Sequence, residues 1–214
     1  IMPATFVDHT HTDAVVTLSN TTNGDALIAE LYPDCLVLPY VMPGFVLSKQ
    51  VYDAIEGVDL AALKGIILLH HGVFTYGDDA KTAYENMISL VDRADRSLAE
   101  HGVVEHAEAT VPVDSLELAK IRRAVSRVRG RAQLAVPDRS PGAQGYASRG
   151  DIDSIATRGP ITPDHVIRTK RVPVIIPEDP GGDVSAIDDY AAAYRAYYDA
   201  HHGDEHTMLD AAPR

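Results

Sequence analysis

Two histidine pairs constrain this chain more than any other feature of its sequence. His9 and His11 are two positions apart, with Thr10 between them, and they follow residues 4–7, a short run of β-branched and aromatic type. Side chains alternate between the two faces of a strand, so both imidazoles are expected on the same side. A second apolar run, residues 65–69, ends in His70 and His71. The pattern therefore predicts imidazoles that converge from two strand ends.

Three imidazoles in an open arrangement suit Zn²⁺ or a similar divalent ion, with one position left for substrate or water. His71 is the expected third ligand, because it stands at the carboxyl end of an apolar strand, where α/β sheets place their ligands. His70 should point the other way and act as a hydrogen-bonded structural histidine. A chain with ten histidines can also produce this spacing by chance. His201 and His202 are interpreted as a surface loop.

Two short stretches carry a resemblance to a known family. Val7-Asp8-His9-Thr10-His11 and Leu69-His70-His71-Gly72-Val73-Phe74 resemble the class II aldolase/adducin family. In that family an H-x-H pair and a later histidine before a glycine hold a catalytic zinc. The resemblance implies that His9, His11 and His71 are the metal ligands. Gly72 would let the backbone approach the metal side closely.

Two further stretches, residues 157–170 and 207–214, point to one subgroup of this family. They are similar to the aldolase part of bifunctional proteins that join a rhamnulose-1-phosphate-type aldolase to a short-chain dehydrogenase. The resemblance covers essentially the whole chain and implies an internal piece of a longer protein. The implied fold is α/β: a layered α/β/α aldolase core with a central mixed sheet, its N-terminal part missing, and a C-terminal α/β extension.

The charge distribution suggests where the two parts meet. Up to Asp114 the chain has 17 acidic and 5 basic residues, whereas the remainder has 14 of each. We expect the aldolase core at residues 1–112 and the extension at residues 113–214, leading towards an absent dehydrogenase domain.

Apolar periodicity, caps and turn residues predict the individual elements. Expected strands are residues 4–7, 14–18, 35–38, 65–69, 133–136 and 172–176. Expected helices are residues 25–31, 47–55, 79–100, 115–129 and 185–201, with a helical turn at 59–63 and a loop at 137–150.

The composition excludes several classes of function. A net charge of −12 argues against a nucleic-acid partner, because a phosphate backbone requires a basic face. No apolar run is long enough to span a bilayer, which argues against a membrane partner. The single cysteine, Cys35, excludes an internal disulfide framework and suits the reducing cytoplasm.

The resemblance implies zinc-dependent aldol cleavage of a ketose 1-phosphate into dihydroxyacetone phosphate and an aldehyde. The metal would stabilise the enediolate, and Asp8 or Asp13 is a candidate for orienting the imidazoles. The general base is expected upstream of Ile1, so the isolated chain should hold the metal without turnover. A homo-oligomer such as a tetramer is also implied.

Other functions stay open on the sequence alone. An adducin-like interaction domain would lack a working metal site, whereas a sugar-phosphate epimerase or decarboxylase would use the same zinc. His165, with the basic segment 168–171, predicts either an anion site and a wall of the active centre or an ordered loop capped by Asp164. Tyr40 lies in a proline-rich loop, where it is either a hydroxyl donor or a packed aromatic residue.

Overall fold

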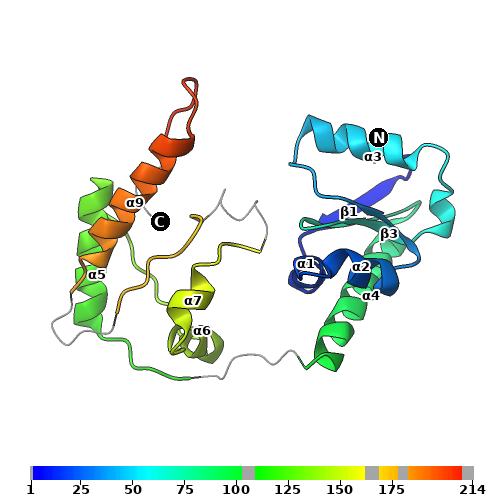
Figure 1. The fold of residues 1–214 in the computed structure, drawn as a ribbon. Helices are drawn as coiled ribbons and strands as arrows, with labels where there is room; N and C mark the ends of the chain where they lie inside the picture. Colours follow the sequence, from blue (N-terminus) through cyan, green and yellow to red (C-terminus); the bar gives the residue numbers. More distant parts are fainter. Residues whose placement is uncertain (1, 103–108, 162–168, 178–182, 209–214) are drawn as a thin grey trace. The chain divides into compact units, whose positions relative to one another are not determined.

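The computed structural model describes residues 2–102, 109–161, 169–177 and 183–208 of the chain (Figure 1). It divides into two compact units. The first comprises Ile1–Val104 and Ile161–Asp164, and the second comprises Glu105–Pro160 and His165–Arg214.

A mixed four-stranded sheet forms the centre of the first unit. Its strands are β1 (Phe6–Thr10), β2 (Cys35–Leu38), β3 (Gly65–Leu68) and β4 (Gly72–Gly77), in the order β1-β4-β3-β2. β2 and β3 are parallel, and β4 is antiparallel to both β1 and β3. The expected strands at residues 35–38 and 65–69 are therefore confirmed. The first strand begins two residues later than expected, so it includes His9.

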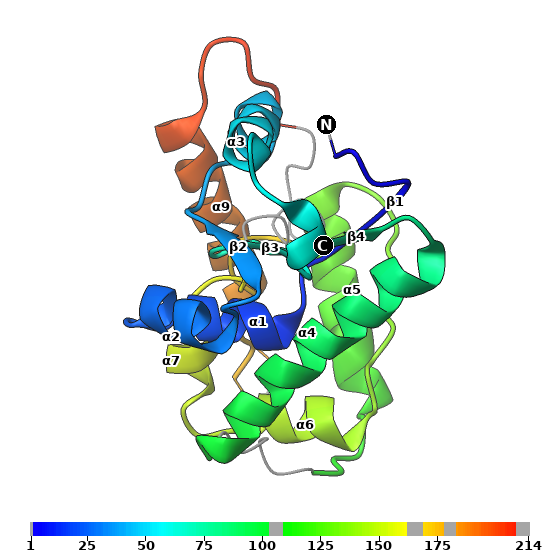
Figure 2. The same ribbon diagram turned by 90° about the vertical axis from the view of Figure 1, so that its right-hand side faces the viewer.

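Helices cover both faces of this sheet, as the expected α/β/α layering requires (Figures 1 and 2). One face packs against α1 (Asp13–Ser19), α2 (Gly24–Leu31) and α4 (Ala80–Glu100). The other face packs against α3 (Phe45–Ile55) and the 3₁₀ turn η1 (Leu60–Ala62). Ile67 and Val73 point into the first layer, whereas Ile66 and Leu68 point into the second.

Helix α1 replaces the strand that was expected at residues 14–18, so that prediction was wrong. The β-branched residues there suggested a strand, but Val15 and Leu18 pack into the core against α2 and α4. Tertiary packing of an apolar helical face thus overrides the local β propensity. Gly24 lets α2 begin close to the end of α1, because a Cβ at this position would lie 2.3 Å from the Ser19 carbonyl oxygen.

Helix α4 has the apolar stripe that its sequence predicts, and of the two expected caps, Asp78 and Asp79, the structure uses Asp79. The Asp79 carboxylate accepts a hydrogen bond from the Thr82 amide at 2.9 Å, which closes the first turn. Its buried residues recur at helical spacing along one side: Ala83, Met87, Leu90 and Ala94.

Helices make up the regular structure of the described residues in the second unit. These are α5 (Ser115–Arg129), α6 (Pro141–Ala147), α7 (Ile152–Ala156) and α9 (Ala186–His201). α5 and α9 pack side by side (Figure 1), and Arg127 on α5 pairs with Asp188 on α9 at 2.7 Å. Asp114 caps α5 and Gly130 ends it with φ 66°, as expected.

Three expectations for this unit were wrong. Residues 133–136 and 172–176 have no regular secondary structure and pair with no strand in the described part of the chain, so the two strands expected there do not form. Leu134 and Val136 are 93% and 89% exposed, as expected for a segment without a partner strand. α6 forms inside the expected loop, because Ser140 caps it and Pro141 opens it.

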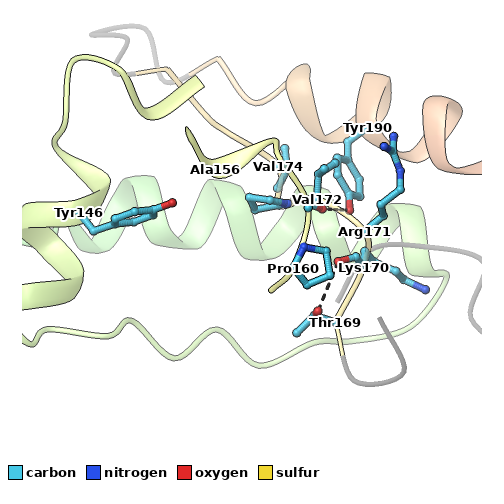
Figure 3. A pocket seen from close by; sticks show the side chains of 11 residues that line it. Tyr146, Ala156, Pro160, Thr169, Lys170, Arg171, Val172, Val174 and Tyr190 are labelled. Carbon is cyan, nitrogen blue, oxygen red and sulfur yellow. Dashed lines mark hydrogen bonds between the residues drawn. The ribbon is translucent and has the colours of Figure 1, made fainter. Parts of the chain in front are cut away.

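A cavity of about 590 Å³ also lies in the second unit (Figure 3). Tyr146 on α6 lines one part of it, and Val172 and Val174 line another. Lys170 lines it too, but its ammonium group donates to the Tyr194 hydroxyl at 3.0 Å. The expected anion site in this region remains a prediction. Of the helices described in either unit, none combines the length and apolar character needed to cross a membrane.

Candidate metal centre

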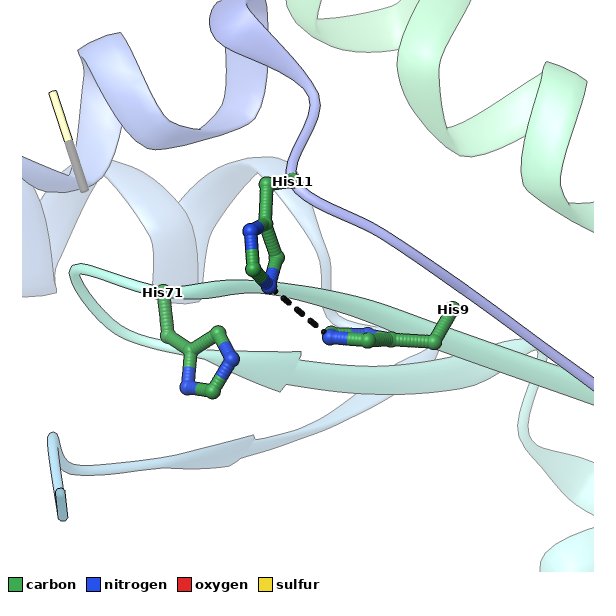
Figure 4. A group of neighbouring side chains, drawn as sticks. All are labelled: His9, His11 and His71. Atoms are coloured by element: carbon green, nitrogen blue, oxygen red, sulfur yellow. Dashed lines mark hydrogen bonds between the residues drawn. The ribbon is translucent and has the colours of Figure 1, made fainter. Parts of the chain in front are cut away.

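Three histidines from two neighbouring parts of the sheet come together at one point (Figure 4). His9 is on β1, His11 follows the end of β1, and His71 lies in the turn between β3 and β4. One ligand nitrogen from each ring lies within 4.8 Å of the others. His9 is exposed, His11 is half-buried and His71 is buried, so the group opens to solvent on the His9 side.

The strand register explains why these side chains meet. His9 lies opposite Phe74 and Thr10 lies opposite Val73, so the chain after Thr10 runs beside the start of β4. Gly72 makes this approach possible. A Cβ there would lie 2.5 Å from the Thr10 carbonyl oxygen, 2.9 Å from His11 Cδ2 and 3.2 Å from His9 Cε1.

His9 is held in one orientation by two contacts with β4. Its Nδ1 lies 2.9 Å from the Val73 carbonyl oxygen, which can only accept a hydrogen bond, so Nδ1 carries the proton. Its ring also stacks on Phe74, with centroids 4.0 Å apart and planes 15° apart. The neutral ring therefore has its lone pair on Nε2, the atom that faces His11.

The nitrogen spacing can be compared with that of a tetrahedral zinc site. Zn–N bonds of roughly 2.0–2.1 Å place two ligand nitrogens about 3.3 Å apart. Nε2 of His9 and Nε2 of His11 are 3.0 Å apart, close to that separation. The largest separation within the group is 4.8 Å or less, so modest side-chain rotation brings the third nitrogen into range. The three residues fit a divalent metal ion.

The contacts of His9 also bear on the expected orienting residues. The partner of its Nδ1 is a backbone carbonyl, a common second partner for metal-binding histidines, and not the carboxylate of Asp8 or Asp13.

Phe74 and Val73, which contact His9, belong to β4, a strand that was not expected. The signal for it was present in Val73-Phe74-Thr75-Tyr76, a β-branched and aromatic run.

His70 has the structural role expected of it. Its φ is +58°, a left-handed conformation that costs an L-residue roughly 1–2 kcal/mol. Its Nδ1 lies 2.7 Å from Asn20 Oδ1, and its amide donates to Ser19 Oγ at 3.1 Å. These bonds hold the ring outside the histidine group.

The other sequence candidates lie elsewhere. His201 and His202 are exposed at the end of α9, where their rings pack on Tyr197 and Tyr198. Tyr40 is 36% exposed, and its role as a hydroxyl donor or a packed aromatic residue stays open. His165 and Arg168 lie outside the described residues.

Cys35 is also unsuited to act as a thiolate ligand or nucleophile. It begins β2 and is partly buried against the first core layer. Burial raises the pKa of its thiol to about 12, so the thiol is protonated at neutral pH.

Comparison with known proteins places the chain in a family. Residues 2–98 match the family model described as class II aldolase and adducin N-terminal domain, and residues 112–214 match that of aldolase class II, second domain. An uncharacterized oxidoreductase of Bacillus subtilis (strain 168), YuxG, is 25% identical over 232 residues, covering 100% of this chain and 33% of that protein. The chain thus spans about a third of this relative's length.

Two solved structures were also found to be similar. The N-terminal class II aldolase domain of a conserved Thermoplasma acidophilum protein is 37% identical, with 45% of this chain and 44% of that chain covered and a TM-score of 0.41. An aldolase II superfamily protein from Pseudomonas syringae is 18% identical, with 76% and 52% covered and a TM-score of 0.35. Because the two family models together match residues 2–98 and 112–214, the chain belongs to the class II aldolase and adducin family.

Proposed function

We propose that this chain carries the zinc centre of a metal-dependent aldolase that cleaves a ketose 1-phosphate, such as rhamnulose 1-phosphate, into dihydroxyacetone phosphate and an aldehyde. The observation that carries the proposal is the group of His9, His11 and His71, whose ligand nitrogens lie within 4.8 Å of one another. Membership of the class II aldolase family supports the reaction type.

The donor set favours zinc over magnesium or calcium. Three imidazole nitrogens suit zinc, whereas magnesium and calcium prefer oxygen ligands. The metal, when bound, would supply a Lewis acid that stabilises the negative charge of an enediolate. The neutral imidazoles would leave its positive charge undiminished.

The protein's own contribution is to fix the ligands before the metal arrives. The Val73 carbonyl keeps the lone pair of His9 on Nε2, and Phe74 restrains the plane of that ring. The exposed His9 side leaves access for a polar substrate such as a sugar phosphate. We retain the proposal that Asp8 or Asp13 adds to the orientation of the ligands. Its test is that exchange of either for Asn weakens zinc affinity.

Metal content tests the first part of the proposal. About one zinc per chain is expected by elemental analysis of the parent, and none in a His9→Ala/His11→Ala double variant. The matched control is His201→Ala/His202→Ala, which removes two exposed histidines from the second unit. Equal zinc in both double variants would contradict the assignment.

The reaction is tested on the zinc-loaded protein with rhamnulose 1-phosphate as the probe. Dihydroxyacetone phosphate released only by zinc-binding variants would support aldol cleavage. An epimeric sugar phosphate or carbon dioxide as product would instead assign an epimerase or a decarboxylase. If turnover needs residues outside this chain, a hydroxamate mimic of the enediolate should still bind it in a zinc-dependent manner. A chain that binds zinc but not the mimic would favour an interaction domain.

The wider setting is also a proposal. We place the protein in the cytoplasm as a homo-oligomer, such as a tetramer, with an aldolase core at residues 1–112 and an extension at 113–214. The Bacillus subtilis relative is named an uncharacterized oxidoreductase, which supports fusion to a dehydrogenase in a longer protein. Mass measurement of the native assembly tests the oligomer.

A further inference from the structure

His71 lies in a turn, residues 69–71, whose three backbone amides all donate hydrogen bonds to the sheet or to α1. The Leu69 amide donates to the Leu38 carbonyl at the end of β2 at 3.0 Å, and the His71 amide donates to the Leu68 carbonyl at 3.2 Å. Between them, the His70 amide donates to Ser19 Oγ at 3.1 Å. Ser19 is itself buried, and its hydroxyl donates to the Val16 carbonyl at 3.1 Å. The turn is therefore tied to the carboxyl end of α1.

The turn also contains a backbone conformation that needs support. His70 has φ +58°, and its backbone direction sets where His71, the next residue, leaves the turn. Residues with a Cβ hold such a conformation only when their surroundings fix it. The side chain of His70 has one such support, the contact of its Nδ1 with Asn20 Oδ1 at 2.7 Å.

Asn20 connects His70 with a distant segment of the same compact unit. Asn20 caps the end of α1, and its amide donates to the Val16 carbonyl at 2.9 Å. Its side-chain Nδ2 donates to the carbonyl of Ile161 at 2.8 Å, 141 positions along the chain.

The Ile161 contact also determines which way the Asn20 amide faces. A carbonyl oxygen can only accept, so the NH₂ group of Asn20 must point at Ile161 and its Oδ1 at His70. Oδ1 is an acceptor, so Nδ1 of His70 must carry the proton in that bond. One side chain thus joins three segments: the end of α1, the turn before His71, and Ile161.

From these contacts we infer that Asn20 is a positioning residue of the metal centre. By holding His70 in its left-handed conformation, it sets the position of His71 without touching the metal or the substrate. Ile161 fixes the orientation of Asn20, so the residue before the Thr162-Pro163-Asp164-His165 motif supports the same ligand. The inference rests on the proposed function, because it requires the histidine group to bind a metal.

Zinc affinity of Asn20 variants tests the inference. Asn20→Ala should lower it about tenfold, the low end of the range seen when an outer partner of a ligand is removed. It should also change the visible absorption of the Co²⁺-substituted protein, which reports ligand geometry. Asn20→Asp keeps an acceptor for His70 but loses the donor to the Ile161 carbonyl, so its loss of affinity should be smaller than that of Asn20→Ala. Thr21→Ala is the control, because Thr21 also bonds to the end of α1, through the Leu18 carbonyl at 2.8 Å, away from the turn.

A His70→Gly protein tests whether Asn20 acts on His71 through the conformation of His70. Glycine adopts the left-handed conformation without strain, so in a His70→Gly protein the further change Asn20→Ala should have no additional effect on zinc affinity. An equal loss in both backgrounds would overturn the inference. So would an Asn20→Ala protein with the affinity and Co²⁺ spectrum of the parent.

Failure of the proposed function would look different. A parent that binds no zinc would refute the metal centre and this inference together. A parent that binds zinc, with Asn20→Ala unaffected, would refute the inference alone. Thermal unfolding of the metal-free variants separates loss of the site from loss of the fold, because Asn20→Ala and Thr21→Ala should unfold at similar temperatures.

Discussion

Replacement of Gly72 by alanine should disrupt the metal centre while leaving the first unit folded. The new methyl group would lie 2.5 Å from the Thr10 carbonyl oxygen, whereas ordinary van der Waals contact begins at 3.4 Å. β1 and β4 would therefore have to separate locally by about 0.9 Å. Metal ligand distances tolerate only about 0.2 Å, so a shift of this size at His9 and His11 should reduce zinc affinity about 10- to 100-fold.

Gly72→Ala should lower the free energy of unfolding by only a fraction of its total value. Overpacking of this kind costs about 1–3 kcal/mol, against a typical stability of about 5–15 kcal/mol for a domain. Zinc affinity is measured by competition with a chelator, and the free energy of unfolding by urea titration of the metal-free protein. Gly150→Ala is the matched control, because a Cβ there meets nothing within 4 Å. Parent-like zinc affinity in Gly72→Ala would refute the reasoning.

Two further predictions concern the scaffold. Leu90→Ala should destabilise the protein by about 2–5 kcal/mol in urea titration, because Leu90 is fully buried between α4 and the sheet; a cost no larger than that of Leu116→Ala, on the exposed face of α5, would contradict this. Asp34 pairs with Arg93 at 2.6 Å, and this hydrogen bond holds the pKa of the Asp34 carboxyl below its usual value. The pair therefore stabilises the fold above about pH 4, and this contribution is lost as the pH falls through the lowered pKa. Asp34→Asn should be less stable near neutral pH and lose less stability on acidification; parallel curves of unfolding free energy against pH would contradict this.

The sequence predicted that His9, His11 and His71 come together, because short local patterns mark each of them as lying at or near a strand end. The pairing of β1 with β4, which joins the two segments, was not predicted. His9 and His11 share a strand and its end, and His71 is fixed by the apolar run before it and the glycine after it. The different roles of His70 and His71 were predicted from strand alternation, but both residues follow the end of β3 at Leu68, and the left-handed conformation of His70 is what separates their side chains. The long helix α4 was also predicted from the sequence, because its capping aspartates and its buried apolar residues all lie in one continuous segment.

What the sequence did not predict depends on distant partners. Val15 and Leu18 have the composition of a strand, and only their packing against α2 and α4 explains a helix. Val136 has the apolar character of a strand residue, but a strand also needs a neighbour to bond with. The contact of Asn20 with Ile161 joins residues 141 positions apart, and the left-handed conformation of His70 depends on such contacts.

The central claim is that His9, His11 and His71 bind one zinc ion. X-ray absorption at the zinc edge of the loaded protein tests it most directly. The proposed centre predicts one tightly bound zinc per chain, with three imidazole nitrogens at about 2.0–2.1 Å and one oxygen ligand from water or substrate. The imidazole signal should disappear in the His9→Ala/His11→Ala protein and persist in the His201→Ala/His202→Ala protein. A zinc shell of oxygen ligands alone, or an imidazole signal unchanged in the first double variant, would contradict the claim.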